Sequence, residues 1–134
     1  MKGQCLCQAV TIETAETQEL HACHCNNCRK WNGGGSAFSF QAQGIDIIGK
    51  EHIKSYQLVE WGTRNFCQNC GTNLFFHQTG TDNYFVSAGL FDQQAFKLAT
   101  QFFIDKKASY YELANDTPKL TEAQIIAMYE NDGK

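Results

Sequence analysis

The chain lacks the features by which membrane-spanning and exported proteins are recognised. No apolar run approaches the ~20 residues that a bilayer-spanning helix needs. Residues 1–5 contain no apolar segment of the kind found in secretory signals. We therefore expect a cytoplasmic protein with no membrane partner, whose cysteines remain reduced.

The chain also has little proline and little excess charge. Pro118 is the one proline among 134 residues, and no Pro/Ser-rich linker or repeat divides the chain. A net charge of −3 gives no electrostatic reason to expect a nucleic acid as partner. A chain of this length can bury one modest core, so we expect a single zinc-binding domain over residues 1–134.

No cysteine stands alone. The seven cysteines form a C-x-C, a C-x-C-x-x-C and a C-x-x-C cluster: Cys5 and Cys7; Cys23, Cys25 and Cys28; Cys67 and Cys70. In a reducing compartment such clusters favour metal ligation over disulfides. Because seven thiols cannot all pair within one chain, a division into four and three suits one closed metal site and one open site. Disulfides or redox couples are the alternative.

The first predicted metal site combines Cys5 and Cys7 with Cys67 and Cys70. Zinc with four thiolates is coordinatively complete, which is typical of a structural site. Residues 64–72 predict a zinc knuckle, in which Gly71 relieves the backbone after the second cysteine. The alternative is two buried thiols beside an unrelated knuckle.

The second predicted site uses the remaining thiols, Cys23, Cys25 and Cys28. Zinc with three thiolates keeps one position for water or a substrate sulfur, which is the arrangement of catalytic zinc. Coordination would also lower the pKa of an incoming thiol, so that it would bind as thiolate at neutral pH.

Three polar neighbours of this cluster leave alternatives open. His24 is either a fourth ligand or a polar neighbour of the metal. Without metal, one thiolate would be the nucleophile, its pKa lowered by His24, Arg29 or Lys30. Arg29 and Lys30 are either the anchor for the carboxylate of a small anionic substrate or a solvated basic pair.

The hydrophobic pattern predicts a mainly β fold. Alternating or short apolar segments bounded by turn residues predict strands, at residues 5–14, 36–41, 44–49, 53–61, 73–77, 83–88 and 100–104. Thr121 and Gln124 form a capping box, which predicts a short C-terminal helix from Glu122 to about Asn131.

Taken in order, the motifs resemble the glutathione-dependent formaldehyde-activating enzyme family, which includes the centromere protein V relatives. The resemblance runs from Gly3 to about Leu113. It is carried by Gly3-x-Cys5-x-Cys7, Cys23-His24-Cys25-x-x-Cys28-Arg29-Lys30-Trp31, Phe66-Cys67-x-x-Cys70-Gly71 and Gly89-Leu90-Phe91-Asp92.

This resemblance implies an Mss4-like β-tent of antiparallel sheets pinned by structural zinc. It implies a carbon–sulfur lyase that condenses formaldehyde with glutathione to S-hydroxymethylglutathione, or runs the reverse reaction. Its partners would then be a small thiol and a small aldehyde, with glutathione as co-substrate and zinc as cofactor. The residues that match the two zinc sites are Cys5, Cys7, Cys67 and Cys70 for the structural zinc, and Cys23, Cys25 and Cys28 for the functional zinc.

The chain differs from the family pattern at three places. Members usually carry a tryptophan where this chain has Tyr110-Tyr111, a proline near Leu98-Ala99, and a shorter glycine run than residues 33–35. Two alternative functions follow from the same residues. One is a non-catalytic zinc module that binds a protein partner, and the other is a redox sensor in which the three clustered thiols release zinc and form a disulfide.

Overall fold

The computed structural model describes residues 1–92 and 95–132, which form two compact units. The first unit comprises residues 1–18 and 39–95, and the second comprises residues 19–38 and 96–134. Each cysteine cluster lies wholly within one unit. The single domain over residues 1–134 stays a prediction, and positions 133 and 134 lie outside the described residues.

The first unit contains a small antiparallel sheet centred on Ile12, which is fully buried. Ile12 lies opposite Gly3 on one side and Ile47 on the other. Gly3 has no room for a side chain, because a Cβ would lie 2.8 Å from the carbonyl oxygen of Leu90. The sheet's strands are β1 (Lys2–Gln4), β2 (Thr11–Glu13) and β5 (Asp46–Ile48).

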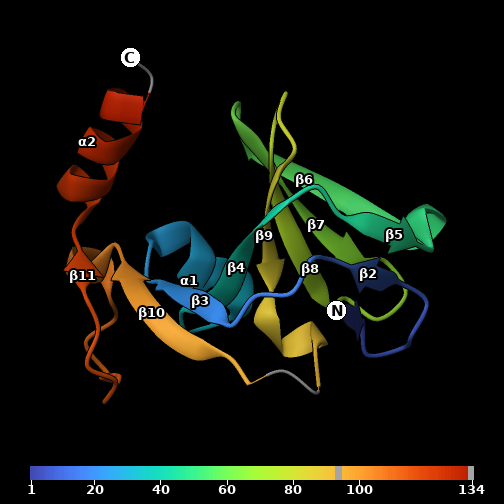
Figure 1. Ribbon diagram of the computed structural model, residues 1–134, viewed down its shortest axis with the longest axis horizontal. Coiled ribbons are helices and arrows are strands. Elements are labelled where there is room, and N and C mark those ends of the chain that lie inside the picture. The colour runs from blue at the N-terminus through green and yellow to red at the C-terminus, as the bar shows by residue number, and fades with distance from the viewer. Residues whose placement is uncertain (93–94, 133–134) are drawn as a thin grey trace. The chain divides into compact units, whose positions relative to one another are not determined.

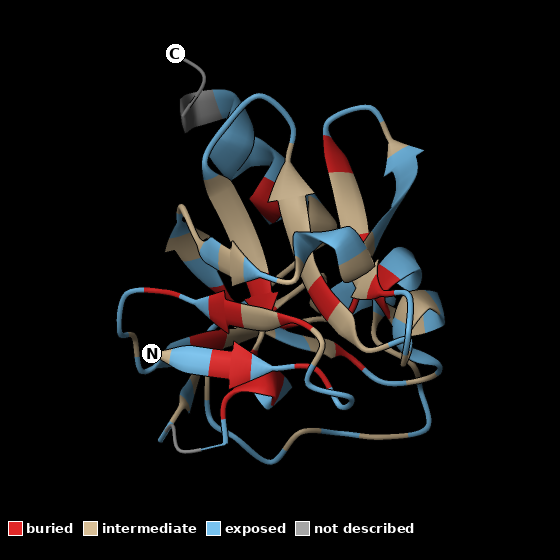
Figure 2. Cartoon of the chain, turned by 90° about the vertical axis from the view of Figure 1, so that its right-hand side faces the viewer, coloured by how far each residue is buried: buried red, intermediate tan, exposed pale blue. Residues whose placement is uncertain are grey.

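A longer antiparallel run in the same unit has the strand order β4-β9-β8-β7-β6 (Figure 1). Phe40, Leu74 and Val86 are its buried core, and the ring of Phe40 meets Phe91 edge-on at 5.3 Å. β4, β8 and β9 each contain one buried residue and β6 contains none; buried residues are red in Figure 2. The strands are β4 (Ala37–Gln43), of which residues from Ser39 onward belong to this unit, β6 (Ile53–Val59), β7 (Gly62–Cys67), β8 (Asn73–Gln78) and β9 (Asn83–Ser87).

In the second unit β10 lies between β3 and β11 and pairs in parallel with both. Leu20 and Ala22 are buried on β3, but two of the most deeply buried side chains of this unit, His24 and Gln101, are polar. The elements are β3 (Glu19–Cys23), α1 (Asn26–Asn32), β10 (Lys97–Phe102), β11 (Lys119–Leu120) and α2 (Glu122–Asp132).

The helix ends follow from their capping residues. Cys25 caps the N-terminus of α1, and Gly33 ends it in the left-handed conformation with φ +79°. The capping box of α2 is present: the amide of Gln124 donates to the Thr121 hydroxyl, and the amide of Thr121 donates to the Gln124 side chain. Three short 3₁₀ helices complete the described elements: η1 (Lys50–His52), η2 (Ala88–Leu90) and η3 (Ile104–Lys106).

The predicted mainly β class with a short C-terminal helix is confirmed. The strand predicted at residues 5–14 is reduced to β2, because residues 5–10 form a loop that closes on itself by hydrogen bonds from Cys5 to Val10 and from Gln8 to Cys5. The sequence pattern predicted neither α1 nor the parallel pairing of β10. A helix of seven residues is too short to be marked by an apolar stripe.

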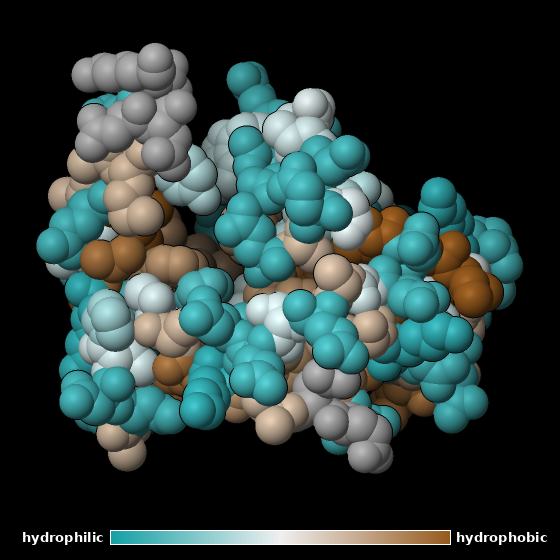
Figure 3. Space-filling view, in the orientation of Figure 1, coloured by the Kyte–Doolittle hydropathy of each residue, from teal (hydrophilic) through white to brown (hydrophobic). Residues whose placement is uncertain are grey.

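Hydrophilic and weakly apolar residues cover most of the face drawn in Figure 3, with apolar patches between them. The exposed apolar side chains include Leu6, Leu58 and Trp61. Within the described residues, no helix has both the length and the apolar character that a membrane crossing requires.

Replacing Gly49 by alanine is expected to destabilise the first unit by about 2–4 kcal/mol, combining left-handed strain with overpacking. Gly49 has φ +91°, and a Cβ there would lie 2.0 Å from the carbonyl oxygen of Ala9, in the loop that carries Cys5 and Cys7. Gly44→Ala is the matched control, because Gly44 has φ +77° and nothing within 4 Å of the added Cβ. Urea unfolding of both variants separates the left-handed strain, which both share, from the contact with Ala9, which Gly49→Ala alone makes. Equal losses of unfolding free energy in the two variants would contradict a role for that contact.

Candidate metal centres

Four sulfurs converge in the first unit, those of Cys5, Cys7, Cys67 and Cys70, all within 4.8 Å of one another. The Cys7 sulfur lies 3.7 Å from that of Cys5 and 3.7 Å from that of Cys67. These separations are far longer than the ~2.05 Å of a disulfide. Cys5 and Cys67 are buried, whereas Cys7 is exposed. The cluster therefore joins two chain segments that are about sixty residues apart in sequence.

Local hydrogen bonds fix the backbone segments that carry these sulfurs. In the knuckle, the Cys67 amide donates to the Thr72 carbonyl and the Gly71 amide donates to the Cys67 carbonyl, while Gly71 adopts φ +79° as its position predicted. The Thr72 hydroxyl accepts from the Leu6 amide and lies 3.1 Å from the Cys70 sulfur. Thr72 thus links the knuckle to the loop that carries the other two cysteines.

The thiols of this cluster have pKa values that diverge. The backbone N–H of Ala9 lowers the pKa of Cys7, but desolvation and the other three sulfurs outweigh it and raise that pKa to about 12. The Thr72 hydroxyl is the main cause that lowers the pKa of Cys70 to about 5. Crowded thiols separate in this way because like charges resist sharing one site. A divalent cation would remove that repulsion and displace the protons.

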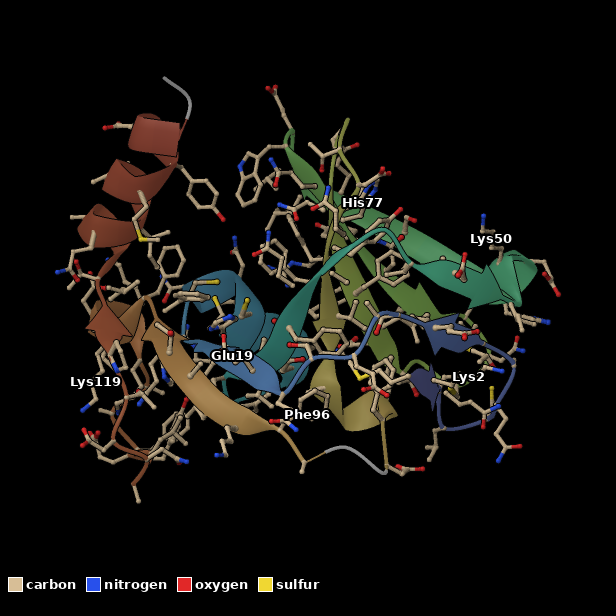
Figure 4. The ribbon with its side chains drawn as sticks, in the orientation of Figure 1. Lys2, Glu19, Lys50, His77, Phe96 and Lys119 are labelled. Atoms are coloured by element: carbon tan, nitrogen blue, oxygen red, sulfur yellow. The ribbon has the colours of Figure 1, made fainter. Side chains whose placement is uncertain are left out.

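Three sulfurs converge in the second unit, those of Cys23, Cys25 and Cys28, again within 4.8 Å of one another. Cys23 ends β3, Cys25 caps α1, and Cys28 lies in the first turn of that helix. The Cys25 sulfur accepts the Cys28 amide at 3.3 Å. Cys28 is buried, whereas Cys23 and Cys25 are partly exposed. Sulfur atoms lie beside β3 and α1 in Figure 4.

This cluster is also crowded. Hydrogen bonds with Cys25 and Cys28, together with burial, raise the pKa of Cys23 well above its usual range. Arg29 and Lys30 both lie on α1 directly after Cys28. Arg29 is half-buried as a residue, and its guanidinium donates to the Asn26 side chain at 3.3 Å in an exposed hydrogen bond, whereas Lys30 is exposed.

Both clusters fit zinc by their donor chemistry and spacing. Thiolates are ligands that zinc prefers, and a Zn–S bond of about 2.3 Å in a tetrahedron places neighbouring sulfurs about 3.8 Å apart. The 3.7 Å separations in the four-cysteine cluster match that edge, and the sulfurs of the three-cysteine cluster lie within 4.8 Å of one another. The four-cysteine cluster could therefore complete a tetrahedron, and the three-cysteine cluster could fill three of its corners.

His24 does not offer a nitrogen to either cluster. Its Nε2 lies 2.9 Å from the Gln101 side-chain oxygen and its Nδ1 lies 2.8 Å from the Tyr111 hydroxyl. Both ring nitrogens are thus used, which disfavours the interpretation of His24 as a fourth ligand. Gln101 and Tyr111 were not found from the sequence, because their partners lie 77 and 87 residues away and no local spacing marks such pairs.

Two of the other histidines, His21 and His77, stack on aromatic rings. His21 stacks on Phe102 at 4.8 Å, and its burial lowers its pKa. His77 stacks on Tyr84 at 4.3 Å. In the part of the chain that the structure describes, neither joins a metal-ligand cluster.

The chain is similar over most of its length to known proteins. The model of the glutathione-dependent formaldehyde-activating enzyme family matches residues 1–106. An uncharacterized lyase of Schizosaccharomyces pombe is 34% identical over 129 residues, which cover 93% of each chain.

A crystal structure of a Rhodobacter sphaeroides protein from a structural-genomics programme shares the fold. It superposes with a TM-score of 0.61 at 21% identity and covers 90% of this chain and 100% of that chain. The family match and the yeast relative extend over most of the sequence. The chain therefore belongs to the glutathione-dependent formaldehyde-activating enzyme family.

Proposed function

We propose that the chain is a zinc-dependent carbon–sulfur lyase that adds a thiol such as glutathione to formaldehyde or a related small aldehyde, and that catalyses the reverse. In the forward direction the thiol sulfur bonds to the carbonyl carbon, the carbonyl π bond breaks, and the thiol proton ends on the oxygen. The product is a hydroxymethyl thioether. The reaction is reversible and needs no oxidant.

The observation that carries the proposal is the difference between the two cysteine clusters. Four convergent thiols can saturate a tetrahedral metal and suit a structural role. Three convergent thiols, of which those of Cys23 and Cys25 are partly exposed, leave one corner for a reactant. Zinc held by Cys23, Cys25 and Cys28 would lower the pKa of a thiol and polarise the reacting atoms.

The polar residues of α1 suit the recognition of the thiol's acidic part. Lys30 is exposed and Arg29 is half-buried, and both follow a proposed ligand in the same helix. A carboxylate of glutathione would accept hydrogen bonds from one of these cations. Arg29 and Lys30 are therefore the proposed anchors of the co-substrate.

The proposal is tested with the purified zinc-loaded protein. Elemental analysis is expected to give two zinc ions per chain. Exchange NMR on a mixture of formaldehyde and glutathione is expected to show interconversion with the adduct at least about tenfold faster than without protein, because metal polarisation contributes several kcal/mol. An unchanged rate, with two zinc ions bound, would contradict the lyase proposal.

A further inference from the structure

A hydrogen-bonded series of polar side chains includes His24 of the three-cysteine segment, and the proposed chemistry assigns it no role. His24 stands between two of the cysteines and is only 2% exposed. Its partner Gln101, on β10, is 1% exposed and donates through Nε2 to the Thr117 hydroxyl at 3.2 Å. The chain of contacts thus runs Tyr111–His24–Gln101–Thr117.

The hydrogen bonds pair both ring nitrogens of His24. The Gln101 oxygen can only accept, so Nε2 of His24 donates to it. Nδ1 of His24 lies 2.8 Å from the Tyr111 hydroxyl, within hydrogen-bond distance. The ring therefore cannot rotate without leaving buried polar atoms unpaired.

The segment that carries Tyr111 is itself held in place. The ammonium of Lys107, with a side chain only 10% exposed, donates to the carbonyl of Ala108 at 2.7 Å and to that of Tyr111, and pairs with Glu112 at 3.1 Å. It also lies 5.0 Å from the centre of the Tyr111 ring. On the other side, the His24 backbone amide donates to the Phe102 carbonyl at 2.9 Å.

We propose that Tyr111 is a positioning residue, which acts through His24 to keep the segment from Cys23 to Cys28 in the conformation that binds metal. His24 cannot turn, so its flanking residues Cys23 and Cys25 keep their sulfurs directed toward Cys28. Outer hydrogen bonds of this kind are worth 10- to 100-fold in metal affinity in other proteins. The inference rests on the proposed function in taking this cluster to be a metal site.

The test compares Tyr111→Phe with Tyr110→Phe. Both variants remove one tyrosine hydroxyl, but that of Tyr110 donates to the carbonyl of Gly34 and not to His24. Cobalt is titrated against a chelator, because sulfur-to-cobalt absorption and ligand-field bands distinguish four-thiolate from three-thiolate coordination. Tyr111→Phe is expected to weaken the three-cysteine site about tenfold. The four-cysteine site in the same molecule, and both sites of Tyr110→Phe, are expected to be unchanged.

A second pair of variants tests Thr117, at the other end of the hydrogen-bonded series from Tyr111. Thr117→Val removes the acceptor of Gln101 and is expected to weaken the same site, whereas Thr117→Ser keeps a hydroxyl and restores wild-type affinity. Amide hydrogen exchange of residues 21–29 in protein that retains only the four-cysteine metal is expected to rise in Tyr111→Phe.

Three outcomes would overturn the proposal. Tyr111→Phe could lose cobalt affinity equally at both metal sites, or it could keep the wild-type affinity at the three-cysteine site. The wild-type protein could also bind one cobalt ion in place of two. These measurements use no substrate, so they do not depend on lyase activity. A protein without lyase activity would contradict the proposed function, but the difference in metal affinity between the two sites would still test the role of Tyr111.

Discussion

Cys67→Ser is expected to abolish the cooperative folding of the first unit and to remove one zinc ion per chain. Cys67 is fully buried, and its sulfur lies 3.7 Å from that of Cys7 across sixty residues of sequence. Zinc contributes on the order of 10–16 kcal/mol in small four-ligand domains, which exceeds or equals the net stability of about 5–15 kcal/mol of most domains. Loss of near-UV circular dichroism and of a cooperative urea transition would show the effect.

Cys28→Ser is the matched control for that result, because it also replaces a buried thiol by a hydroxyl but lies in the three-cysteine cluster. It is expected to retain the urea transition of the first unit. Chelation of wild-type protein should reproduce the Cys67→Ser behaviour, and added zinc should reverse it in the wild type alone. A Cys67→Ser protein with a wild-type urea midpoint would show that the four-cysteine cluster has no structural role.

The second large effect is expected in catalysis. Cys28→Ser should lower the rate of thiol–aldehyde adduct formation at least about 100-fold. Even replacing a hydrogen-bond partner of a metal ligand typically lowers metal affinity or activity about 10- to 100-fold. The measurement is exchange NMR with formaldehyde and glutathione, alongside elemental analysis that should show one zinc ion lost. The physical reason is that two remaining thiols cannot hold the metal in a three-coordinate site.

Asn27→Ala is the control for this variant, because Asn27 is exposed on α1 directly before Cys28. It should retain both zinc ions and the wild-type rate. If Cys28→Ser kept the biological activity of the chain while losing adduct formation, the non-catalytic module would replace the lyase as its function. If mild peroxide released zinc and reversibly joined two of the three thiols, a redox sensor would be favoured.

Much of the β structure was predictable from local pattern. The strands β6, β8 and β9 begin at the predicted residues, and α2 begins at Glu122 as its capping box indicates. These segments have turn residues or caps at their ends, and such signals act over a few residues. The helix α1 was missed because its cap is the thiol of Cys25, which also belongs to a metal-ligand pattern.

The sequence by itself indicated the three cysteine clusters, because metal-ligand spacing is local, and it predicted a division of seven thiols into four and three. The tertiary structure brought Cys5 and Cys7 to Cys67 and Cys70, about sixty residues away. Only the tertiary structure decided what surrounds them. It paired His24 with Gln101 and with Tyr111, 77 and 87 residues away, and it placed β10 parallel to β3. The physical reason is that a buried polar side chain must find a partner wherever the folded chain supplies one. Such partners share no period or spacing along the sequence.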